Sequence, residues 1–179
     1  MCDCQIRANL SWIPMLTIFI LCPTINGLDN GLGLVPPLAW SSWNYFNQAV
    51  NESLIREIGD AMVSTGLASI GFRQINIDSG YLDRERDSHG QMVANSTKFP
   101  SGMRALADYL ASRPISLGLG LYTDITNHTC GSDTGGPGAW GHYEQDAATF
   151  AAWNISYLKV VRSRVHIHHR ALVSVRRTD

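Results

Sequence analysis

Cysteine is nearly absent from the body of this chain. Three of its four cysteines, Cys2, Cys4 and Cys22, fall within the first 27 residues, which leaves Cys130 alone beyond them. A disulfide framework after residue 27 is therefore excluded, and so is a structural zinc site built on cysteine pairs. In a secreted protein, a lone cysteine indicates either a missing partner or a buried free thiol.

Strong net charge is lacking as well. The 179 residues carry a net charge of −1, and only 16% of them are charged. Binding to nucleic acid through bulk positive charge is therefore not expected. The average conceals a shift: residues 28–159 hold eight basic and 13 acidic residues, whereas residues 160–179 hold five arginines and one aspartate. We interpret this shift as a boundary near residue 160.

No apolar run reaches the length of about 20 residues that a membrane-spanning helix needs. The best candidate, residues 12–22, follows Arg7 and precedes the turn-forming segment 23–27. This arrangement is typical of a signal peptide, with Gly27 as a possible cleavage position. We expect residues 1–27 to be removed. The rest of the chain is then expected to be secreted, or held in a vacuolar or lysosomal compartment, without membrane contact.

Four Asn-x-Ser/Thr triplets support this secretory route. Such triplets are acceptors for N-linked glycans, and several of them after a signal-like segment are more informative than any one alone. We predict that at least one carries a glycan. The acceptor asparagines are Asn51, Asn95, Asn127 and Asn154.

Signatures of several other sites are missing. The histidine cluster His166, His168 and His169 has no cysteine or carboxylate at ligand spacing, so no metal site is predicted. The glycine-rich segments 31–33 and 135–138 lack the lysine and the strand–helix context of a phosphate loop. A Gly-x-Ser-x-Gly nucleophile elbow is absent. We therefore expect no cofactor.

What the sequence does contain is an alternation of strands and helices. Strands are predicted over residues 38–45, 72–78 and 117–124 and from residue 157 onward. Helices are predicted from Asn51, as N-cap, to near Gly66, from Ser101 onward, and over residues 141–153. About four β strands with three intervening α helices indicate an α/β fold with a parallel sheet, either doubly wound or a (β/α)₈ barrel.

Strand parity favours the barrel. Ile75 and Ile77 share one face of their strand, whereas Gln74, Asn76 and Asp78 share the other. In the next strand, leucines at 117, 119 and 121 alternate with glycines, a tyrosine and an aspartate. Both faces of an open parallel sheet are apolar, whereas the lumen of a barrel accepts one polar or glycine-rich face. We therefore predict that residues 28–160 form the first half of a (β/α)₈ TIM barrel.

Four side chains are predicted to converge at the carboxyl edge of this sheet, where barrel enzymes place their chemistry. They are Trp40, Asp78, Tyr122 and Lys159. Aromatic rings stack on sugar C–H groups, and carboxylates and lysines bind hydroxyls, so the set indicates a sugar site. Each residue also has a structural alternative: Trp40 as core, Asp78 as a turn cap, Tyr122 packed under a loop, and Lys159 paired with Asp124 or Asp78.

The chain resembles the α-galactosidases (melibiases) of glycoside hydrolase family 27, in collinear order over residues 28–160. The segments that carry the resemblance are 28–32, 36–46, 61–67, 75–78, 99–109, 121–124, 129–130, 144–151 and 157–159. The resemblance implies a retaining enzyme that removes terminal α-D-galactose from oligosaccharides or glycoconjugates, with two carboxyl groups about 5 Å apart. It also implies that Trp40, Asp78, Tyr122 and Lys159 surround the galactose ring, and that Cys130 is half of a disulfide.

The chain departs from the family pattern after the second strand. The family carries Asp-Asp-Cys-Trp where this chain has Asp78-Ser79-Gly80-Tyr81. Ser79 thus replaces a second hydroxyl-binding aspartate, while Gly80 and Gln48 replace a bridged cysteine pair. A specificity for a related sugar such as β-L-arabinopyranose is therefore an alternative.

A larger departure falls at the fourth strand. The resemblance places the nucleophilic aspartate at residue 161 and a cysteine at residue 163, but the chain has Val161 and Ser163. We predict that residues 161–179 are a basic tail foreign to the family, from a splice variant or a misread gene, and that the chain as written is inactive. One alternative is a non-catalytic, sugar-binding or regulatory half-barrel. An active hydrolase that uses other residues is disfavoured, because Asp179 is the only carboxylate residue after Asp146.

Overall fold

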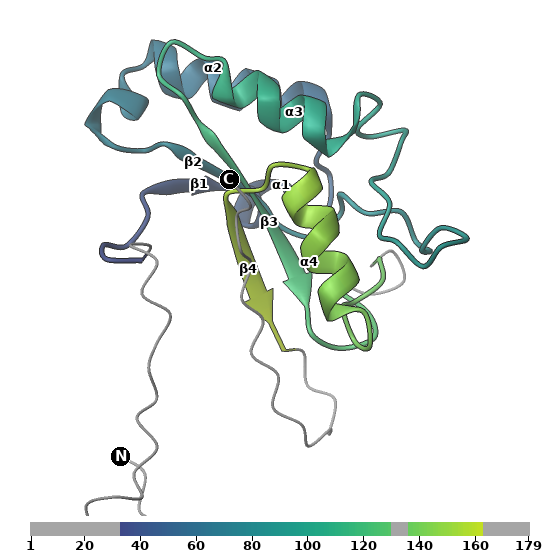
Figure 1. Ribbon diagram of the computed structural model, residues 1–179. Coiled ribbons are helices and arrows are strands. Elements are labelled where there is room, and N and C mark those ends of the chain that lie inside the picture. The colour runs from purple at the N-terminus through teal and green to yellow at the C-terminus, as the bar shows by residue number, and fades with distance from the viewer. Residues whose placement is uncertain (1–32, 130–135, 163–179) are drawn as a thin grey trace, which may run out of the picture. The chain divides into compact units, whose positions relative to one another are not determined.

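A computed structural model describes residues 33–129 and 136–162 (Figure 1). The predicted signal peptide, Cys130, Ser163 and the histidine cluster lie outside the described residues. All the described helices and strands belong to one compact unit, which begins at Val35.

The centre of this unit is a sheet of four parallel strands in the order β1-β2-β3-β4. Each strand therefore pairs with its neighbour in the sequence, as in the successive units of a barrel, whereas the strand order of a doubly wound sheet reverses at a switch point. The strands are β1 (Ala39–Ser41), β2 (Gln74–Ile77), β3 (Gly118–Asp124) and β4 (Tyr157–Val161).

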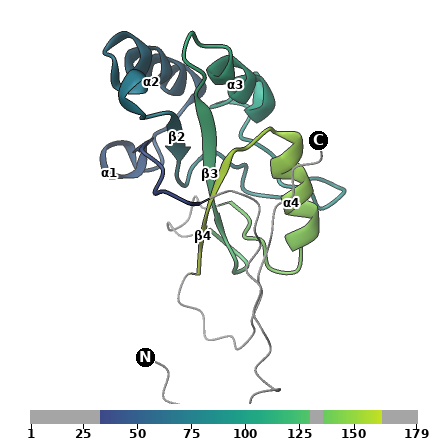
Figure 2. The same cartoon turned by 60° about the vertical axis from the view of Figure 1, so that its left-hand side comes forward.

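Three helices connect the strands and cover one face of the sheet (Figures 1 and 2). They are α2 (Glu52–Ser64), α3 (Gly102–Ala111) and α4 (Tyr143–Ala152). Two short elements were not predicted, α1 (Trp43–Phe46) and the 3₁₀ turn η2 (Leu67–Ile70). The prediction of three helices and four strands is otherwise confirmed.

Local sequence explains the limits of α2. The Asn51 side chain accepts a hydrogen bond from the Leu54 amide at 2.9 Å, which is the predicted N-cap. The helix ends before Gly66, whose φ of +83° suits a residue without a side chain. Within the helix, a Cβ on Gly59 would lie 2.5 Å from the Leu110 side chain, so glycine permits the close approach of α2 and α3.

The core lies between the helices and one face of the sheet. Ile75, Ile77, Leu119 and Leu121 point into it and are at most 1% exposed. Their partners on the helices are also buried and include Ile55, Met62, Met103, Leu106, Leu110 and Phe150. Burial of this apolar surface is the main stabilising contribution, at about 25 cal/mol per Å².

The other face of the sheet has the predicted polar character. Gly118 and Gly120 lie in register with Gln74 and Asn76, and the two polar side chains fill the space that the glycines leave. A Cβ on Gly118 would lie 2.6 Å from Gln74 Oε1. Interlocking of large and absent side chains on neighbouring strands is how a barrel lumen is filled.

The predicted extent of the first strand is wrong. The first strand ends at Ser41 instead of reaching Tyr45, because residues 43–46 turn into α1. The helix α3 begins at Gly102, one residue after the predicted start at Ser101, and the Ser101 amide donates to Glu52 Oε2 at 2.9 Å, which ties the start of α3 to α2.

Candidate functional site

An ion pair at the carboxyl edge of the sheet joins two of the predicted site residues. Lys159 Nζ lies 2.6 Å from Asp78 Oδ2. The Asp78 side chain is 8% exposed, whereas that of Lys159 is 50% exposed. The Lys159 ammonium also lies 5.5 Å from the centre of the Tyr122 ring, since Tyr122 and Lys159 are register partners on β3 and β4. The structure therefore brings Asp78, Tyr122 and Lys159 together.

The Asp78 carboxylate is held by its own turn. Its Oδ1 accepts the Ser79 amide at 2.8 Å, and the Asp78 amide donates to the buried Ser42 hydroxyl at 3.0 Å. Both structural alternatives for this residue, the turn cap and the pairing with Lys159, are thus observed. One carboxylate oxygen orients the group, and the other faces the lysine.

Trp40 is not part of this cluster. It pairs in register with Ile75, which places it in the row of side chains that faces the helices, and its ring centroid lies 6.0 Å from that of Phe46. Trp40 packs against the hydrophobic core, as its structural alternative predicted. The tryptophan that follows the carboxyl end of β1 is Trp43, the first residue of α1. The sequence reading missed it because the predicted strand ran past Ser41.

Buried hydrogen bonds near the Lys159–Asp78 ion pair hold the carboxyl end of β3 in place. The Asp124 carboxylate is fully buried and accepts from the Thr126 amide at 2.9 Å and from the Tyr122 hydroxyl at 3.1 Å. Tyr81 donates its hydroxyl to the Tyr122 carbonyl at 2.8 Å, and burial raises the pKa of Tyr81 well above its ordinary value. Asp124 is therefore a structural carboxylate that holds the Tyr122 ring beside Lys159.

Val161 ends β4 and pairs in register with Asp124. Its carbonyl accepts the Ile125 amide at 2.9 Å, so the main chain of this position is held in the sheet. The side chain is half-buried and aliphatic. Valine at this position has no carboxylate oxygen to supply to the site.

Lys98 supports the turn that carries Asp78. Its ammonium donates to the Gln48 carbonyl at 2.8 Å and to the Gly80 carbonyl at 3.1 Å. The two segments are so close that a Cβ on Gly80 would lie 2.8 Å from Gln48 Cα, and Gly80 has a φ of +103°. Lys98 thus links the two positions, 48 and 80, at which the family resemblance implies a disulfide.

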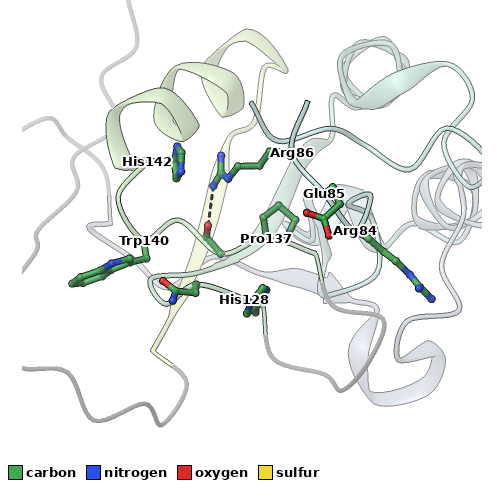
Figure 3. Close-up of a pocket in the computed structure, with 9 residues that line it drawn as sticks. Arg84, Glu85, Arg86, His128, Pro137, Trp140 and His142 are labelled. Atoms are coloured by element: carbon green, nitrogen blue, oxygen red, sulfur yellow. Dashed lines mark hydrogen bonds between the residues drawn. The ribbon is translucent and has the colours of Figure 1, made fainter. Parts of the chain in front are cut away.

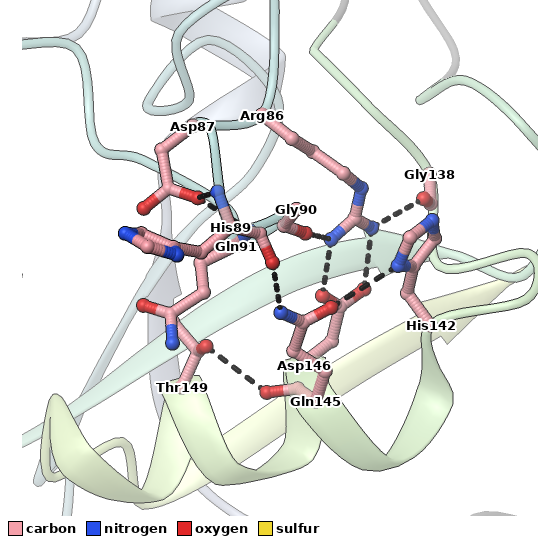
Figure 4. A network of polar contacts seen from close by, with 10 residues as sticks. All are labelled: Arg86, Asp87, His89, Gly90, Gln91, Gly138, His142, Gln145, Asp146 and Thr149. Carbon is pink, nitrogen blue, oxygen red and sulfur yellow. Dashed lines mark hydrogen bonds and ion pairs between the residues drawn. The ribbon is translucent and has the colours of Figure 1, made fainter.

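A second ion pair joins the loop after β2 to α4 (Figure 4). The Arg86 guanidinium donates to both Asp146 oxygens, at 2.6 and 2.8 Å, and the Asp146 side chain is 2% exposed. The same guanidinium donates to the carbonyls of Gly90 and Gly138, each at 2.8 Å. Sequence reasoning missed this pair, and no local pattern points to it.

Among residues 33–129 and 136–162, no three His, Cys, Asp or Glu side chains come together in a way that would hold a metal ion. The same residues include no helix that is long and apolar enough to cross a membrane.

The strand order and the polar cluster at the carboxyl edge indicate the first half of a (β/α)₈ barrel, and comparison with known proteins identifies its family. A family profile described as "Alpha galactosidase A" matches residues 36–171. The chain therefore belongs to the α-galactosidase family of glycoside hydrolases, as its sequence predicted. The predicted boundary near residue 160 lies inside the matched range and stays a prediction.

Individual relatives carry the same name. The chain is 52% identical over 131 residues to an α-galactosidase of Cyamopsis tetragonoloba, which covers 73% of this chain and 31% of that protein. It is 51% identical over 132 residues to an α-galactosidase of Coffea arabica, covering 74% of this chain and 34% of that protein. The chain thus aligns with about a third of the length of these relatives.

Solved structures confirm the fold. α-Galactosidase I of Mortierella vinacea superposes with a TM-score of 0.71 at 34% identity, over 75% of this chain and 33% of that one. An α-galactosidase of Saccharomyces cerevisiae, solved with raffinose, superposes with a TM-score of 0.69 at 38% identity, over 74% of this chain and 28% of that one. The four strands match the first half of the TIM barrel of these enzymes.

Proposed function

We propose that this chain supplies one side of the galactose-binding site of a retaining α-galactosidase and that, as written, it does not hydrolyse its ligand. The observation that carries the proposal is the Lys159–Asp78 pair at the carboxyl edge of the sheet, beside Tyr122. The α-galactosidases among its relatives indicate a terminal α-D-galactose of an oligosaccharide or glycoconjugate as the ligand.

The chemistry of the pair suits a sugar with neighbouring hydroxyls. An ammonium has three donors and no acceptor, and an ionised carboxylate only accepts. A hydroxyl that accepts from Lys159 while another donates to Asp78 therefore satisfies both charged groups at once. Because the Lys159 side chain is half-exposed, it can turn from Asp78 toward a ligand with little loss of packing. Tyr122 is 2% exposed, so its role is to position the ammonium from below.

Hydrolysis needs groups that this chain does not place. A retaining site uses one carboxylate as nucleophile and a second carboxyl group as acid and base. Val161 stands at the nucleophile position and offers no lone pair, and the only carboxylate residue after Asp146 is Asp179. Loss of catalytic groups typically costs several powers of ten in rate. The proposed defect therefore lies in the chemistry and leaves sugar binding in place.

Ser79 bears on which sugar is bound. Its hydroxyl is buried and has no hydrogen-bond partner among the described residues. A buried serine reaches a shorter distance than the aspartate that the family resemblance implies, and it carries no charge. We propose β-L-arabinopyranose as the competing ligand, because it is a close stereochemical relative of α-D-galactose.

A non-catalytic sugar-binding half-barrel is the second candidate function. The observation that favours it is that Asp78 and Lys159 are already oriented while the nucleophile position is aliphatic. Under this reading, binding without turnover is the function itself.

Galactose binding tests the shared part of these proposals. The purified, secreted chain is titrated with galactose, L-arabinose and glucose, and binding is followed by calorimetry or ligand-observed NMR. We expect galactose or L-arabinose to bind and K159M to abolish that binding, whereas the matched control R104M, an exposed cation on α3, leaves it unchanged. Equal binding of all three sugars, or full binding by K159M, would refute the proposed site.

We further propose a secretory route and a foreign tail. Removal of residues 1–27 is checked by sequencing the amino terminus of the secreted protein; a start at Met1 contradicts it.

The tail proposal predicts that the gene continues beyond codon 160 with a segment encoding Asp-x-Cys and further barrel strands. Genomic sequence without such a segment would exclude a splicing or misreading origin.

A further inference from the structure

A pocket of about 320 Å³ lies between the loops that follow β2 and β3 (Figure 3). Its lining includes Arg84 and Glu85 from the first loop and Asn127, His128, Gly138 and Trp140 from the second. The volume lies at the lower end of the range for ligand pockets, about 300–1,000 Å³, and suits roughly one or two sugar rings. None of the three residues of the carboxyl-edge cluster, Asp78, Tyr122 and Lys159, lines it.

The floor of this pocket is fixed before any ligand arrives. Arg86 is held by both oxygens of Asp146 and donates to the Gly138 carbonyl at 2.8 Å (Figure 4). Gly138 in turn donates its amide to the Asn127 carbonyl at 2.8 Å. The main chain of Asn127 is therefore anchored to a rigid floor.

The rim offers groups that recognise a sugar. Trp140 is 38% exposed, and Tyr143 supports its ring edge-on, with the ring centroids 6.4 Å apart. An exposed indole face stacks on the C–H face of a pyranose, and the exposed side chains of Arg84, Glu85 and His128 can bind hydroxyl and acetamido groups. Among the described residues that line the pocket, Glu85 is the one carboxylate, so the set suits sugar binding better than the two-carboxylate chemistry of a glycosidase.

One of the predicted glycosylation sites, Asn127, lies on the rim of this pocket. Asn127 is exposed and is the acceptor of the triplet Asn127-His128-Thr129. The other three acceptors do not line this pocket. Asn51 caps α2, Asn95 accepts the Lys98 amide, and Asn154 lies beside Asp108. A sugar linked to Asn127 is tethered where it needs only to fold back, and such tethering raises its effective concentration to the millimolar range or above.

We propose that Asn127 carries an N-linked glycan whose first N-acetylglucosamine residues pack into this pocket against Trp140. In the modification step, Asn127 Nδ2 displaces a polyisoprenyl diphosphate from C1 of the donor oligosaccharide. An N–C1 bond forms, the C1–O bond to the diphosphate breaks, and the amide proton passes to a base of the transferring enzyme. The glycan then covers the exposed face of Trp140.

The rate of enzymatic deglycosylation tests this proposal on the full chain secreted by a eukaryotic host. Peptide N-glycosidase in heavy-oxygen water marks each released site, and mass spectrometry follows Asn127 and Asn154 separately. On the native protein, we expect Asn127 to be occupied and to release its glycan at least about tenfold more slowly than W140A does, because packing shields the bond in proportion to the closed population. After denaturation, the two proteins should release it equally fast.

Two further variants make the outcome decisive. W140F keeps an aromatic platform and should retain most of the protection even if W140A folds poorly. Y45A removes another exposed aromatic residue, 84% exposed in α1, and should leave the Asn127 rate unchanged. An unoccupied Asn127, or native release at the same rate in the wild type, W140F and W140A, would overturn the proposal. Neither result bears on galactose binding at Asp78 and Lys159.

Discussion

Two of the ion pairs that join distant parts of this chain, Arg86–Asp146 and Lys159–Asp78, have opposite surroundings. Arg86 and Asp146 are 13% and 2% exposed, and the guanidinium makes four hydrogen bonds, two to the carboxylate and two to backbone carbonyls. Lys159 is 50% exposed, and within the described residues it makes one hydrogen bond, to Asp78. In the first pair, the protein itself engages four of the five guanidinium N–H donors, so this pair serves the fold. The second keeps donors available, which is the property of a ligand site.

Breaking the Arg86–Asp146 ion pair should have the largest effect on stability. R86M leaves the Asp146 carboxylate buried without a partner, and removing one member of a buried pair costs about 3–5 kcal/mol. Urea unfolding of R86M should show this loss. R104M removes one member of an exposed pair on α3 and should change the free energy of unfolding by less than about 1 kcal/mol. Equal effects of the two substitutions would contradict the distinction.

Substitution of Lys98 should cause the second-largest loss of stability. K98M removes the hydrogen bonds from the Lys98 ammonium to the half-buried Gln48 and Gly80 carbonyls, and a hydrogen bond to a charged group contributes about 1.5–3 kcal/mol. The loss of free energy of unfolding is measured by urea denaturation. K98R, which keeps a cationic donor, should recover part of the stability. A K98M protein as stable as the wild type would show that the turn at Gly80 does not depend on Lys98.

Breaking the Lys159–Asp78 ion pair should affect sugar binding far more than stability. K159M removes a half-exposed ion pair, so the free energy of unfolding should change by about 0–1 kcal/mol. Thermal unfolding and galactose titration of the same sample separate the two effects. A large loss of stability together with unchanged binding would reverse the roles assigned to the two pairs.

The smallest expected effect concerns pH. Burial acts to raise the pKa of Glu52, but hydrogen bonds from the Ser101 amide and from Arg56 outweigh it, so the pKa lies below its ordinary value. A carboxyl group whose pKa is lowered by folding stabilises the protein above its unfolded pKa, about 4.3, and loses this contribution as the pH falls through the folded value. The free energy of unfolding, measured with urea, should therefore fall less between pH 7 and pH 3 in E52Q than in the wild type. An identical fall in the two proteins would contradict this.

The sequence predicted those features that depend on local pattern. Alternation along Gln74–Ile77 and Gly118–Asp124 identified the core face and the lumen face, and Asn51 marked the start of α2. The position of Trp40 was wrong because three residues of β1 carry too little periodicity to show where the strand ends. The Arg86–Asp146 and Lys98–Gly80 contacts join residues 60 and 18 positions apart, so nothing but the folded loops reveals them.

Turnover of a nitrophenyl α-galactoside tests the central claim most directly. The 179-residue chain is compared with a chimera that continues after Lys159 with the sequence of the Cyamopsis tetragonoloba relative, and with the K159M form of that chimera. We expect the chimera to release nitrophenol, K159M to suppress this release, and the chain as written to remain at the heat-killed background, because Val161 cannot attack the sugar. Turnover by the chain within about tenfold of the chimera would contradict the account.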